Sequence, residues 1–323
     1  MTPEANKPGA GAALHPSARA FLEAMRHAPQ PDQVSLEEFR DATGARVPQR
    51  ACVQLGEVID ETIPGGSGQA LPIRIYRPAG SGPFPAMVWM HAGSFVKGSL
   101  ETSDPSCREL AHMSECLIIS VDYRLAPESP FPKPLHDCYA ALSWACGHCA
   151  RFGGDSRALG VGGQSSGGNL AAATALLAKQ KGGPAVQFQV LFEPVLDASC
   201  GSDSCHELAE GYILTRRQML WMYAQYAPGI SPYDPLLSPL HSEDLSGLPA
   251  AVVVTVEFDP ARDEGQRYAR RLAESKVPVR HACLPGMLHH FPGEEAITTV
   301  SSLLDDLLSA QRLRPTNHAQ EAN

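Results

Sequence analysis

Short apolar segments alternate with helical segments through most of this chain. Seven apolar or β-branched runs bounded by proline and glycine predict buried strands, at residues 72–78, 86–91, 116–123, 158–164, 186–192, 250–256 and 279–284. Helical patterns lie between them, at residues 103–115, 133–146, 167–181, 263–276 and 294–313. This alternation predicts a mainly parallel, doubly wound α/β sheet, in which chemistry is placed at the carboxyl ends of the strands.

Two helical segments do not fit the alternation. Residues 16–45 contain two short helical patterns, and the second starts with Ser35 and Glu38 at capping-box spacing. Residues 205–228 form a further helical segment between two predicted strands. We expect both segments to form a helical cap over the active edge of the sheet, with packing on the flank of the sheet as the alternative.

This interpretation divides the chain into five parts. They are residues 1–45 as the N-terminal part of the cap, 46–204 as core, 205–228 as inserted cap helices, 229–313 as core, and 314–323 as a polar tail.

The overall charge and composition exclude several classes of protein. The 323 residues carry a formal net charge of −9, whereas a nucleic-acid-binding protein needs a basic face. No apolar stretch approaches the roughly 18 residues of a membrane span, and the first residues lack the pattern of a secretory signal. We therefore expect a cytoplasmic protein that binds no nucleic acid and does not insert into a membrane.

The nine cysteines are irregularly spaced, which favours reduced thiols in the cytoplasm. Cys146 and Cys149 form a Cys-x-x-Cys pair, but the pair falls near the end of a predicted helix, where the helix dipole does not favour a thiolate. No second Cys/His pair nearby completes a zinc site. We predict no metal and no cofactor, with a redox or metal role for this pair as the minor alternative.

A glycine-rich turn joins a predicted strand to a predicted helix at residues 162–168. Within it, Gly163-Gln164-Ser165-Ser166-Gly167 fits the pattern Gly-x-Ser-x-Gly. Such a turn is so sharp that bulky neighbours would collide with it, and it raises the serine hydroxyl above the sheet. Ser165 is therefore the candidate nucleophile, with a plain strand-to-helix turn as the alternative.

A serine nucleophile needs a base and an acid that orients the base. The paired histidines in "GMLHHF" (286–291) follow the last predicted strand, and we favour His289 over His290 as the base. Asp259 follows the strand at 250–256, while Asp263 lies at a helix start, where a carboxylate can simply cap the helix. A small-residue loop after residue 91 can supply backbone N–H groups to an oxyanion, together with the N–H of Ser166.

At this point the sequence resembles the hormone-sensitive-lipase-like (bacterial family IV) esterases. The similarity extends over about residues 14–310 and rests on five motifs in the same order, at residues 91–95, 122–132, 162–172, 257–265 and 286–291. The resemblance implies an α/β-hydrolase fold with a helical cap, cofactor-free hydrolysis of carboxylic esters and, frequently, homodimers. By position, Ser165, Asp259 and His289 resemble the family's catalytic triad, and Gly93, Ser94 and Ser166 resemble its oxyanion-hole donors.

Several positions depart from the family pattern. The usual His-Gly-Gly-Gly is altered at Ala92 and Ser94, and Ser94 in a glycine-like conformation would cost on the order of 1 kcal/mol. The usual Gly-Asp-Ser-Ala-Gly is altered at Gln164 and Ser166, and the usual His-Gly-Phe contains His290.

The segment "LFEPVLD" (191–197) has Glu193 where the family usually has an aromatic residue. Some α/β-hydrolases place their acid after this strand. Glu193 and Asp197 are therefore reserve candidates for the acid.

The sequence thus predicts a serine carboxylesterase that acts on small-molecule esters with short to medium acyl chains. Phe95, Lys97 and Tyr212 are candidate substrate-binding residues, with plain packing as the alternative. Two further readings stay open: amide or carbamate hydrolysis, acyl transfer or dehydration on the same triad, and non-catalytic binding of a small molecule. The physiological ester and its stereochemistry do not follow from the sequence.

Overall fold

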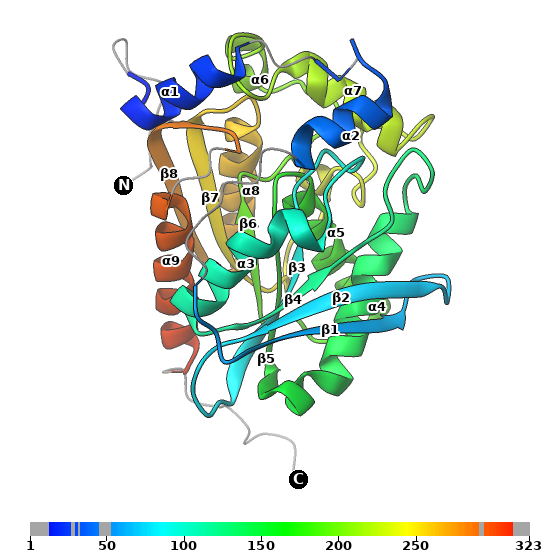
Figure 1. Cartoon of the computed structure of the whole chain (residues 1–323), viewed down its shortest axis with the longest axis vertical. Helices are drawn as coiled ribbons and strands as arrows, with labels where there is room; N and C mark the ends of the chain where they lie inside the picture. The colour runs from blue at the N-terminus through cyan, green and yellow to red at the C-terminus, as the bar shows by residue number, and fades with distance from the viewer. Residues whose placement is uncertain (1–12, 27–29, 32, 45–52, 291–293, 313–323) are drawn as a thin grey trace.

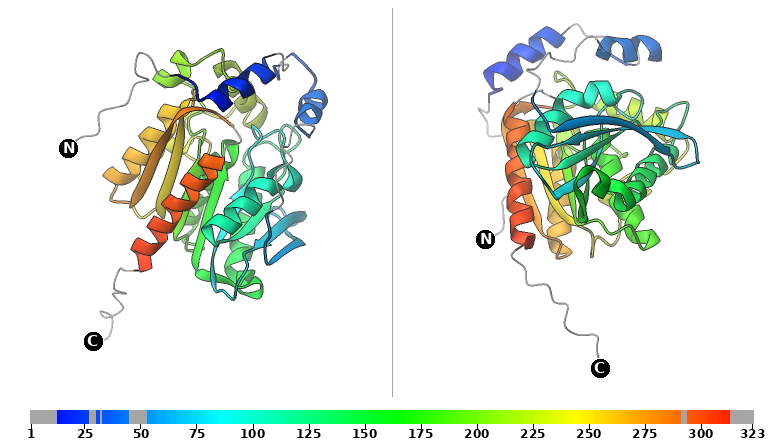
Figure 2. Two further views of the ribbon diagram at one scale, coloured as in Figure 1. Left: turned by 60° about the vertical axis from the view of Figure 1, so that its left-hand side comes forward. Right: turned by 60° about the horizontal axis from the view of Figure 1, so that its bottom comes forward.

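The computed structural model describes residues 13–26, 30–31, 33–44, 53–290 and 294–312. A twisted sheet runs through the centre of the molecule, and helices cover both of its faces (Figures 1 and 2). The strands are β1 (Glu57–Pro64), β2 (Ala70–Arg77), β3 (Phe84–Met90), β4 (Leu117–Val121), β5 (Gly154–Gln164), β6 (Phe188–Phe192), β7 (Ala250–Phe258) and β8 (Val279–Leu288).

The helices follow the strands in the alternating order that the sequence predicts. The α-helices are α1 (Pro16–Met25), α2 (Leu36–Gly44), α3 (Leu100–Ser114), α4 (Lys133–His148), α5 (Ser166–Lys181), α6 (Asp203–Glu207), α7 (Arg216–Tyr226), α8 (Arg262–Glu274) and α9 (Glu294–Arg312). Two short 3-10 helices complete the described elements, η1 (Cys149–Phe152) and η2 (Pro239–His241).

The strand order in the sheet is β1-β2-β4-β3-β5-β6-β7-β8. β2 is antiparallel to β1 and β4, and every pair from β4 through to β8 is parallel. The order reverses around β3, because β4 and β5 flank it on either side. This is the mostly parallel, doubly wound sheet of the α/β-hydrolase fold, as predicted.

β1 was not predicted from the sequence. Its segment, EVIDETIP, carries three acidic residues and is only partly buried, because β1 is an edge strand with a single neighbour. Edge strands commonly carry charges that discourage further pairing, and those charges obscure the apolar signal on which a sequence-based prediction depends.

Two hydrophobic cores lie on the two faces of the sheet. One contains buried side chains of α4, α5 and α8 together with side chains of the sheet, and the other contains buried side chains of α3 and α9. β5 passes between them and carries glycine at 160, 162 and 163, so that large side chains from neighbouring elements fill the space: Phe188 at Gly160, and Met87 and Trp89 at Gly162. The central strands are therefore buried on both faces, which fixes the position of their ends.

Four helices, α1, α2, α6 and α7, lie together across one end of the sheet (Figure 1). Ala18 of α1 packs in a small cluster with Leu208, Phe258 at the end of β7 and Leu288 at the end of β8. Phe39 of α2 packs edge-on against Trp221 of α7, with ring centroids 5.5 Å apart. These helices come from the two segments that the sequence predicts as a cap.

The boundaries of these segments differ slightly from the prediction. The inserted helical segment begins at Asp203, two residues before the predicted boundary, because Ser202 caps α6 by accepting a hydrogen bond from the N–H of Cys205 at 3.3 Å. The capping box at α2 is confirmed, since the Ser35 N–H donates to Glu38 at 2.8 Å and the Glu38 N–H donates to the Ser35 hydroxyl at 3.2 Å. The predicted polar tail, residues 314–323, lies outside the described residues.

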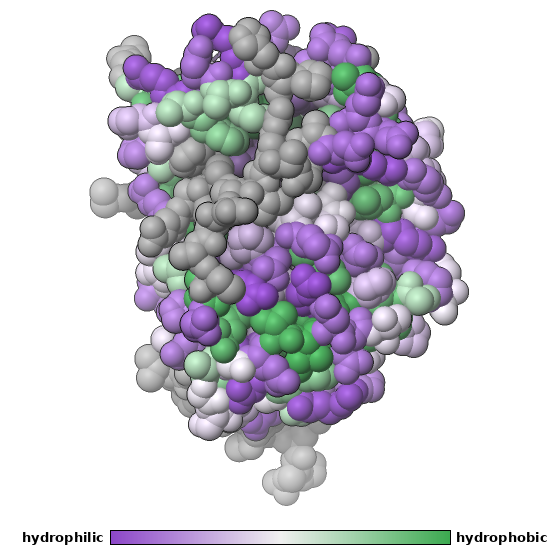
Figure 3. Space-filling model, viewed as in Figure 1, coloured by the Kyte–Doolittle hydropathy of each residue, from purple (hydrophilic) through white to green (hydrophobic). Residues whose placement is uncertain are grey.

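The surface of the face seen in Figure 1 is mostly polar, with hydrophobic residues in scattered patches (Figure 3). Among the described residues, the large hydrophobic side chains that are exposed are Leu220, Ile230 and Tyr233. None of the described helices is both long enough and apolar enough to cross a membrane.

Candidate active site

The ends of five parallel strands place five functional groups side by side. His91 directly follows β3, Ser165 follows β5, Glu193 follows β6, Asp259 follows β7 and His289 follows β8. These strands are consecutive neighbours in the sheet, and parallel strands end at the same edge. Residues that lie up to 198 positions apart in the chain therefore meet at one edge of the sheet.

The turn at Ser165 is strained in the way that the glycine pattern predicts. Ser165 has φ 56° and ψ −117°, a backbone conformation that is rare for a residue with a side chain. A Cβ atom at Gly163 would overlap the carbonyl of Gly167, and a Cβ atom at Gly167 would overlap the carbonyls of Met90 and His91. Only glycine fits at either flank, and the turn holds Ser165 at the start of α5.

A chain of two hydrogen bonds links three of the predicted site residues. Ser165 Oγ lies 2.8 Å from His289 Nε2, and His289 Nδ1 lies 2.7 Å from Asp259 Oδ2. The second oxygen of Asp259 accepts the N–H of Ala261 at 2.9 Å, which fixes the carboxylate. All three side chains are buried, with residue exposures of 7%, 4% and 0% for Ser165, His289 and Asp259.

The charges around His289 favour its protonated form. Burial alone would lower the pKa of the imidazole, but the Asp259 carboxylate and then the Glu193 carboxylate outweigh it and raise the pKa to about 9. The site is therefore built to stabilise an imidazolium, the form that a histidine takes when it accepts the proton of a serine.

The adjacent His290 is placed differently. The strand β8 ends at Leu288, and His290 takes a left-handed backbone conformation with φ 58° that leaves its side chain exposed. Near the site, its backbone N–H donates to Glu193 Oε1 at 2.8 Å. Phe291, the last residue of the same motif, lies outside the described residues.

The alternative acids of the sequence are engaged elsewhere. Asp263 accepts hydrogen bonds from the Ser204 N–H at 2.8 Å and from Arg262 at 2.9 Å, so it fastens α6 to the start of α8. Asp197 lies 2.9 Å from His241 Nε2 and also accepts the hydroxyl of Ser199. Of the reserve candidates, only Glu193 lies beside the serine–histidine pair.

The loop after β3 has a strained backbone. Gly93 has φ 142° and Ser94 has φ 58°, so Ser94 occupies the left-handed region that the family pattern gives to glycine. A Cβ atom at Gly93 would overlap the carbonyl of Lys97. Within the described part of the chain, the N–H groups of Gly93, Ser94 and Ser166 donate to no protein acceptor.

His91 stabilises this loop through a hydrogen bond and a ring contact. Its Nδ1 lies 2.9 Å from the carbonyl of Ala92, and its ring stacks on Tyr123 with centroids 4.2 Å apart. The Tyr123 hydroxyl in turn donates to the carbonyl of His91 at 2.8 Å. Burial lowers the pKa of His91 to about 4, so this imidazole is neutral at physiological pH.

The three candidate substrate-binding residues lie in different surroundings. Phe95 is fully buried, and its ring stacks on Tyr226 with centroids 3.9 Å apart, so it packs in the core. Lys97 places its ammonium 3.7 Å from the ring centre of Phe39 in α2. Tyr212 is partly buried and its ring lies 5.6 Å from that of Phe258, in the small cluster under α1.

The contacts of the Glu193 side chain were not predicted from the sequence. Its Oε1 accepts hydrogen bonds from Gln164 Nε2 at 2.7 Å and from the N–H of His290 at 2.8 Å. Ligand-type atoms of Glu193, Asp259 and His289 lie within 4.8 Å of one another, close enough to hold a metal ion. Because the Asp259–His289 hydrogen bond already occupies two of these groups, the arrangement is that of an acid–base cluster.

The Cys146–Cys149 pair shows no feature of a reactive dithiol. Cys146 is exposed on α4 and Cys149 is buried at the start of η1, so the pair lies at the end of a helix, as predicted. Burial raises the pKa of the Cys149 thiol, which opposes formation of a thiolate.

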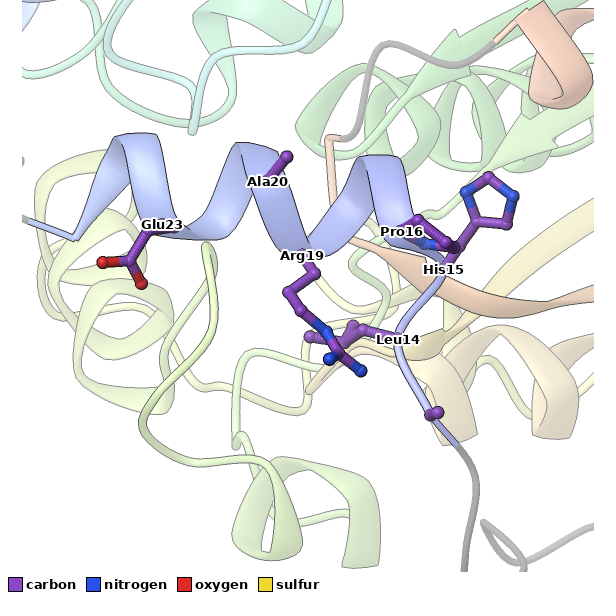
Figure 4. Close-up of a pocket in the computed structure, with 7 residues that line it drawn as sticks. Leu14, His15, Pro16, Arg19, Ala20 and Glu23 are labelled. Atoms are coloured by element: carbon purple, nitrogen blue, oxygen red, sulfur yellow. The ribbon is translucent and has the colours of Figure 1, made fainter.

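A surface cavity of about 790 Å³ lies against α1. Leu14, Arg19 and Glu23 are among its lining residues, and the Arg19 side chain points away from the axis of α1 (Figure 4). None of Ser165, Asp259 and His289 lines it.

Comparisons with known proteins agree with this architecture. A family model described as the alpha/beta hydrolase fold matches residues 87–293. The carboxylic ester hydrolase LipN of Mycobacterium tuberculosis is 40% identical over 242 residues, which cover 73% of this chain and 64% of LipN. The ethyl acetate hydrolase of Pseudomonas putida is 33% identical over 296 residues, which cover 86% of this chain and 92% of that enzyme.

A solved structure extends the similarity to three dimensions. The esterase of Pyrobaculum calidifontis superimposes with a TM-score of 0.84 at 35% identity, covering 91% of this chain and 99% of the esterase. The matched family model, these relatives and the shared sheet topology lead to one assignment: the chain belongs to the hormone-sensitive-lipase-like (bacterial family IV) branch of the α/β-hydrolase family.

Proposed function

We propose that this protein is a serine carboxylesterase that works through an acyl-enzyme formed on Ser165. His289 Nε2 takes the proton of the Ser165 hydroxyl as the oxygen attacks the ester carbonyl. The imidazolium then gives this proton to the departing alcohol, and the acyl group stays on Ser165. Water, deprotonated by His289, releases the acid and restores the serine. Asp259 orients the imidazole and stabilises its charged form.

The observation that carries this proposal is the unbroken chain from Ser165 to His289 to Asp259. Both distances, 2.8 Å and 2.7 Å, are within hydrogen-bonding range. The relatives named as ester hydrolases support the same reaction class.

The backbone N–H groups of Gly93, Ser94 and Ser166 are the proposed donors to the oxyanion. Support for this role comes from their lack of protein acceptors among the described residues and from the left-handed turn at Gly93 and Ser94. Donors of this kind are typically worth about 3 kcal/mol each in the transition state.

Esters with short to medium acyl chains are the proposed substrates. Ser165 is only 7% exposed, and α1, α2, α6 and α7 are the proposed cap above it. Lys97 and Tyr212 are proposed to face the bound ester from the cap side, whereas the buried packing of Phe95 favours an indirect role for that residue. The relative named ethyl acetate hydrolase supports a small substrate.

The test is hydrolysis of a series of p-nitrophenyl esters, from acetate to palmitate. The wild-type chain should be most active on the short members, and Ser165→Ala should abolish turnover. Ser143→Ala is the matched control, because this exposed serine on α4 hydrogen-bonds only within its own helix. Turnover retained in Ser165→Ala, or absent from the wild type, would reject the proposal.

Two further expectations complete the proposal. We expect a cytoplasmic enzyme and a homodimer, which cell fractionation and light scattering of the purified chain can test.

A further inference from the structure

Glu193 occupies an unusual place beside the triad. It directly follows β6, has a left-handed backbone with φ 39°, and donates its N–H to the carbonyl of Val254 at 2.6 Å. A non-glycine residue in this conformation costs free energy, and such strain concentrates at functional sites. The turn buries the Glu193 side chain, which is 1% exposed, among the ends of the central strands.

One oxygen of the Glu193 carboxyl group accepts two hydrogen bonds, and the other accepts none among the described residues. Oε1 accepts the Gln164 amide at 2.7 Å and the His290 N–H at 2.8 Å. Oε2 is buried and has no hydrogen-bond partner among the described residues. Because ligand-type atoms of Glu193, Asp259 and His289 lie within 4.8 Å of one another, a second carboxyl group faces the proposed base.

Gln164 and Glu193 are complementary to each other. Gln164 directly precedes the proposed nucleophile, and its side-chain amide donates to Glu193. A carboxylate at position 164 would instead repel Glu193 and leave its Oε1 with one donor fewer. The amide at 164 therefore permits a buried glutamate at 193.

We infer that Glu193 is a positioning residue of the proposed esterase site, which holds the turn at His290 and stabilises the imidazolium of His289 together with Asp259. The inference rests on the proposed function, since it assigns a role relative to the proposed base. Glu193 acts through His289 and the turn that carries it.

The surrounding charges make Glu193 and His289 titrate together. Burial raises the pKa of Glu193 to about 7, the His289 imidazolium and the Gln164 amide act in the opposite direction, and Asp259 raises it further. An ionised Glu193 and a protonated His289 stabilise each other, so the two groups share macroscopic titrations. Removing the glutamate charge should lower the pKa of His289, because a nearby opposite charge favours the charged form.

The test is Glu193→Gln, which keeps an acceptor for the His290 N–H and removes the charge. Two quantities are measured: the pH at which kcat/KM rises, and the titration of His289 by NMR in the absence of substrate. Both should move to lower pH by about one unit or more. The plateau kcat should fall several-fold while KM changes little, because the lost charge acts on the imidazolium formed in the transition state.

Glu257→Gln is the matched control. Glu257 accepts the N–H of Gly286 at 2.7 Å, so it holds the same strand end through one backbone bond, and it is not among the groups that shift the pKa of His289. This variant should leave the pH profile and the His289 titration where they are in the wild type. An equal shift in both variants would mean that loosening β8, and not the charge, moves the profile, and would overturn the inference.

A second variant keeps the inference testable where Glu193→Gln does not fold. Gln164→Met removes the amide that favours the ionised glutamate, so it should move the His289 titration in the same direction by a smaller amount. A titration unmoved in either folded variant would overturn the inference. Because the NMR titration needs no turnover, these outcomes differ from the failure of ester hydrolysis that would reject the proposed function itself.

Discussion

His289 shows how single residues set the working range of this site. Its pKa is raised from the ordinary 6.5 to about 9, in opposition to the burial that would lower it. A base must be unprotonated before it can take the proton of Ser165. The proposed mechanism therefore predicts an enzyme whose activity is lost on the acid side.

The first prediction concerns pH. Because the folded-state pKa of His289 is raised, kcat/KM should fall as pH decreases through the alkaline range near 9 and should reach its plateau above it. Steady-state kinetics on a short-chain ester between pH 6 and pH 10, corrected for spontaneous hydrolysis, provides the measurement. A profile centred at or below 6.5, the ordinary histidine value, would contradict the charge environment described here.

The second prediction concerns Asp259. Asp259→Asn retains the shape of the side chain but loses the negative charge that faces His289 Nδ1. By analogy with other serine triads, kcat should fall by about four orders of magnitude with little change in folding. Asp263→Asn is the control, because Asp263 binds Ser204 and Arg262, away from His289. Similar losses of kcat in both variants would argue against Asp259 as the acid.

Some residues of the candidate site could be predicted from the sequence more readily than others. Ser165 has a strong local signal, because the required glycines are next to it in the sequence. Two adjacent histidines, His289 and His290, cannot be distinguished by residue type. Which of them faces Ser165 depends on where strand β8 ends, and it ends at Leu288. The sequence indicates Glu193 only as a reserve acid, since its contacts with Gln164 and His290 bridge 29 and 97 positions of the chain.

At the scale of elements, the turn between β5 and α5 depends on the absence of two Cβ atoms. The segments around it are pressed together so closely that carbonyl groups of Met90 and His91 occupy the space that an alanine at 167 would need. Backbone atoms cannot rotate away as a flexible side chain can, so the strand and the helix would have to separate.

Gly167→Ala should therefore lower the free energy of unfolding by about 3 kcal/mol or more. Gly147→Ala is the matched control, since a Cβ atom there meets nothing within 4 Å and the residue lies in the last turn of α4. That variant should be as stable as the wild type or more stable by less than about 1 kcal/mol, because alanine favours the helix. Denaturant unfolding of both variants measures the difference, and equal stabilities would contradict the described turn.

A second element-scale prediction concerns the start of α4. Asp137 is fully buried and accepts hydrogen bonds from Arg124 at 2.7 Å, Gln69 at 2.7 Å and the N–H of Gly66 at 2.9 Å. Burial would raise the pKa of Asp137, but Arg124 and these donors outweigh it and lower the pKa below 3.8. Ionised Asp137 thus stabilises the fold at neutral pH, and this contribution is lost as pH falls through the lowered pKa.

Asp137→Asn should cost about 3 kcal/mol at neutral pH, because it leaves the Arg124 charge without its partner. The difference from the wild type should shrink as pH falls from 3.8 through the lowered pKa of Asp137, below which the wild-type carboxyl is neutral as well. Urea unfolding across this pH range checks the prediction. Asp244→Asn breaks an exposed pair with Lys179 and should leave stability almost unchanged at every pH.

At the scale of the whole molecule, a single arginine side chain links α2 of the proposed cap to two loops of the core. Arg40 of α2 donates to the carbonyl of Val96 at 2.7 Å, to the carbonyl of Ala126 at 3.0 Å and to both oxygens of Glu128 at 2.8 Å. These acceptors lie in the loops that follow β3 and β4, so one side chain holds α2 against the loop that contains Gly93 and Ser94.

Arg40→Ala should loosen α2 without unfolding the core. Amide hydrogen exchange in residues 36–44 should become at least several-fold faster, while the midpoint of thermal unfolding changes little. Glu128→Gln is the control, since it leaves the two carbonyl contacts intact. Unchanged exchange in Arg40→Ala would mean that α2 is held by its packing against Trp221 instead.

Sequence patterns predicted the whole-molecule architecture because buried parallel strands are marked by apolar runs that the flanking glycines and prolines delimit. The edge strand β1 escaped prediction because its exposed, acidic segment lacks that mark. The order β4-β3-β5 and the antiparallel direction of β2 were not predicted in detail, since strand neighbours depend on long-range packing that no local pattern encodes.

The placement of the site on successive strand ends also has a consequence for how the protein is made. The proposed nucleophile follows β5 at position 165, but the proposed acid and base follow β7 and β8, at positions 259 and 289. A growing chain on the ribosome therefore carries its serine through more than a hundred residues of synthesis before a base exists to activate it. The chain should become able to cleave esters only when its final strand joins the sheet, so that the onset of activity reports the completion of folding.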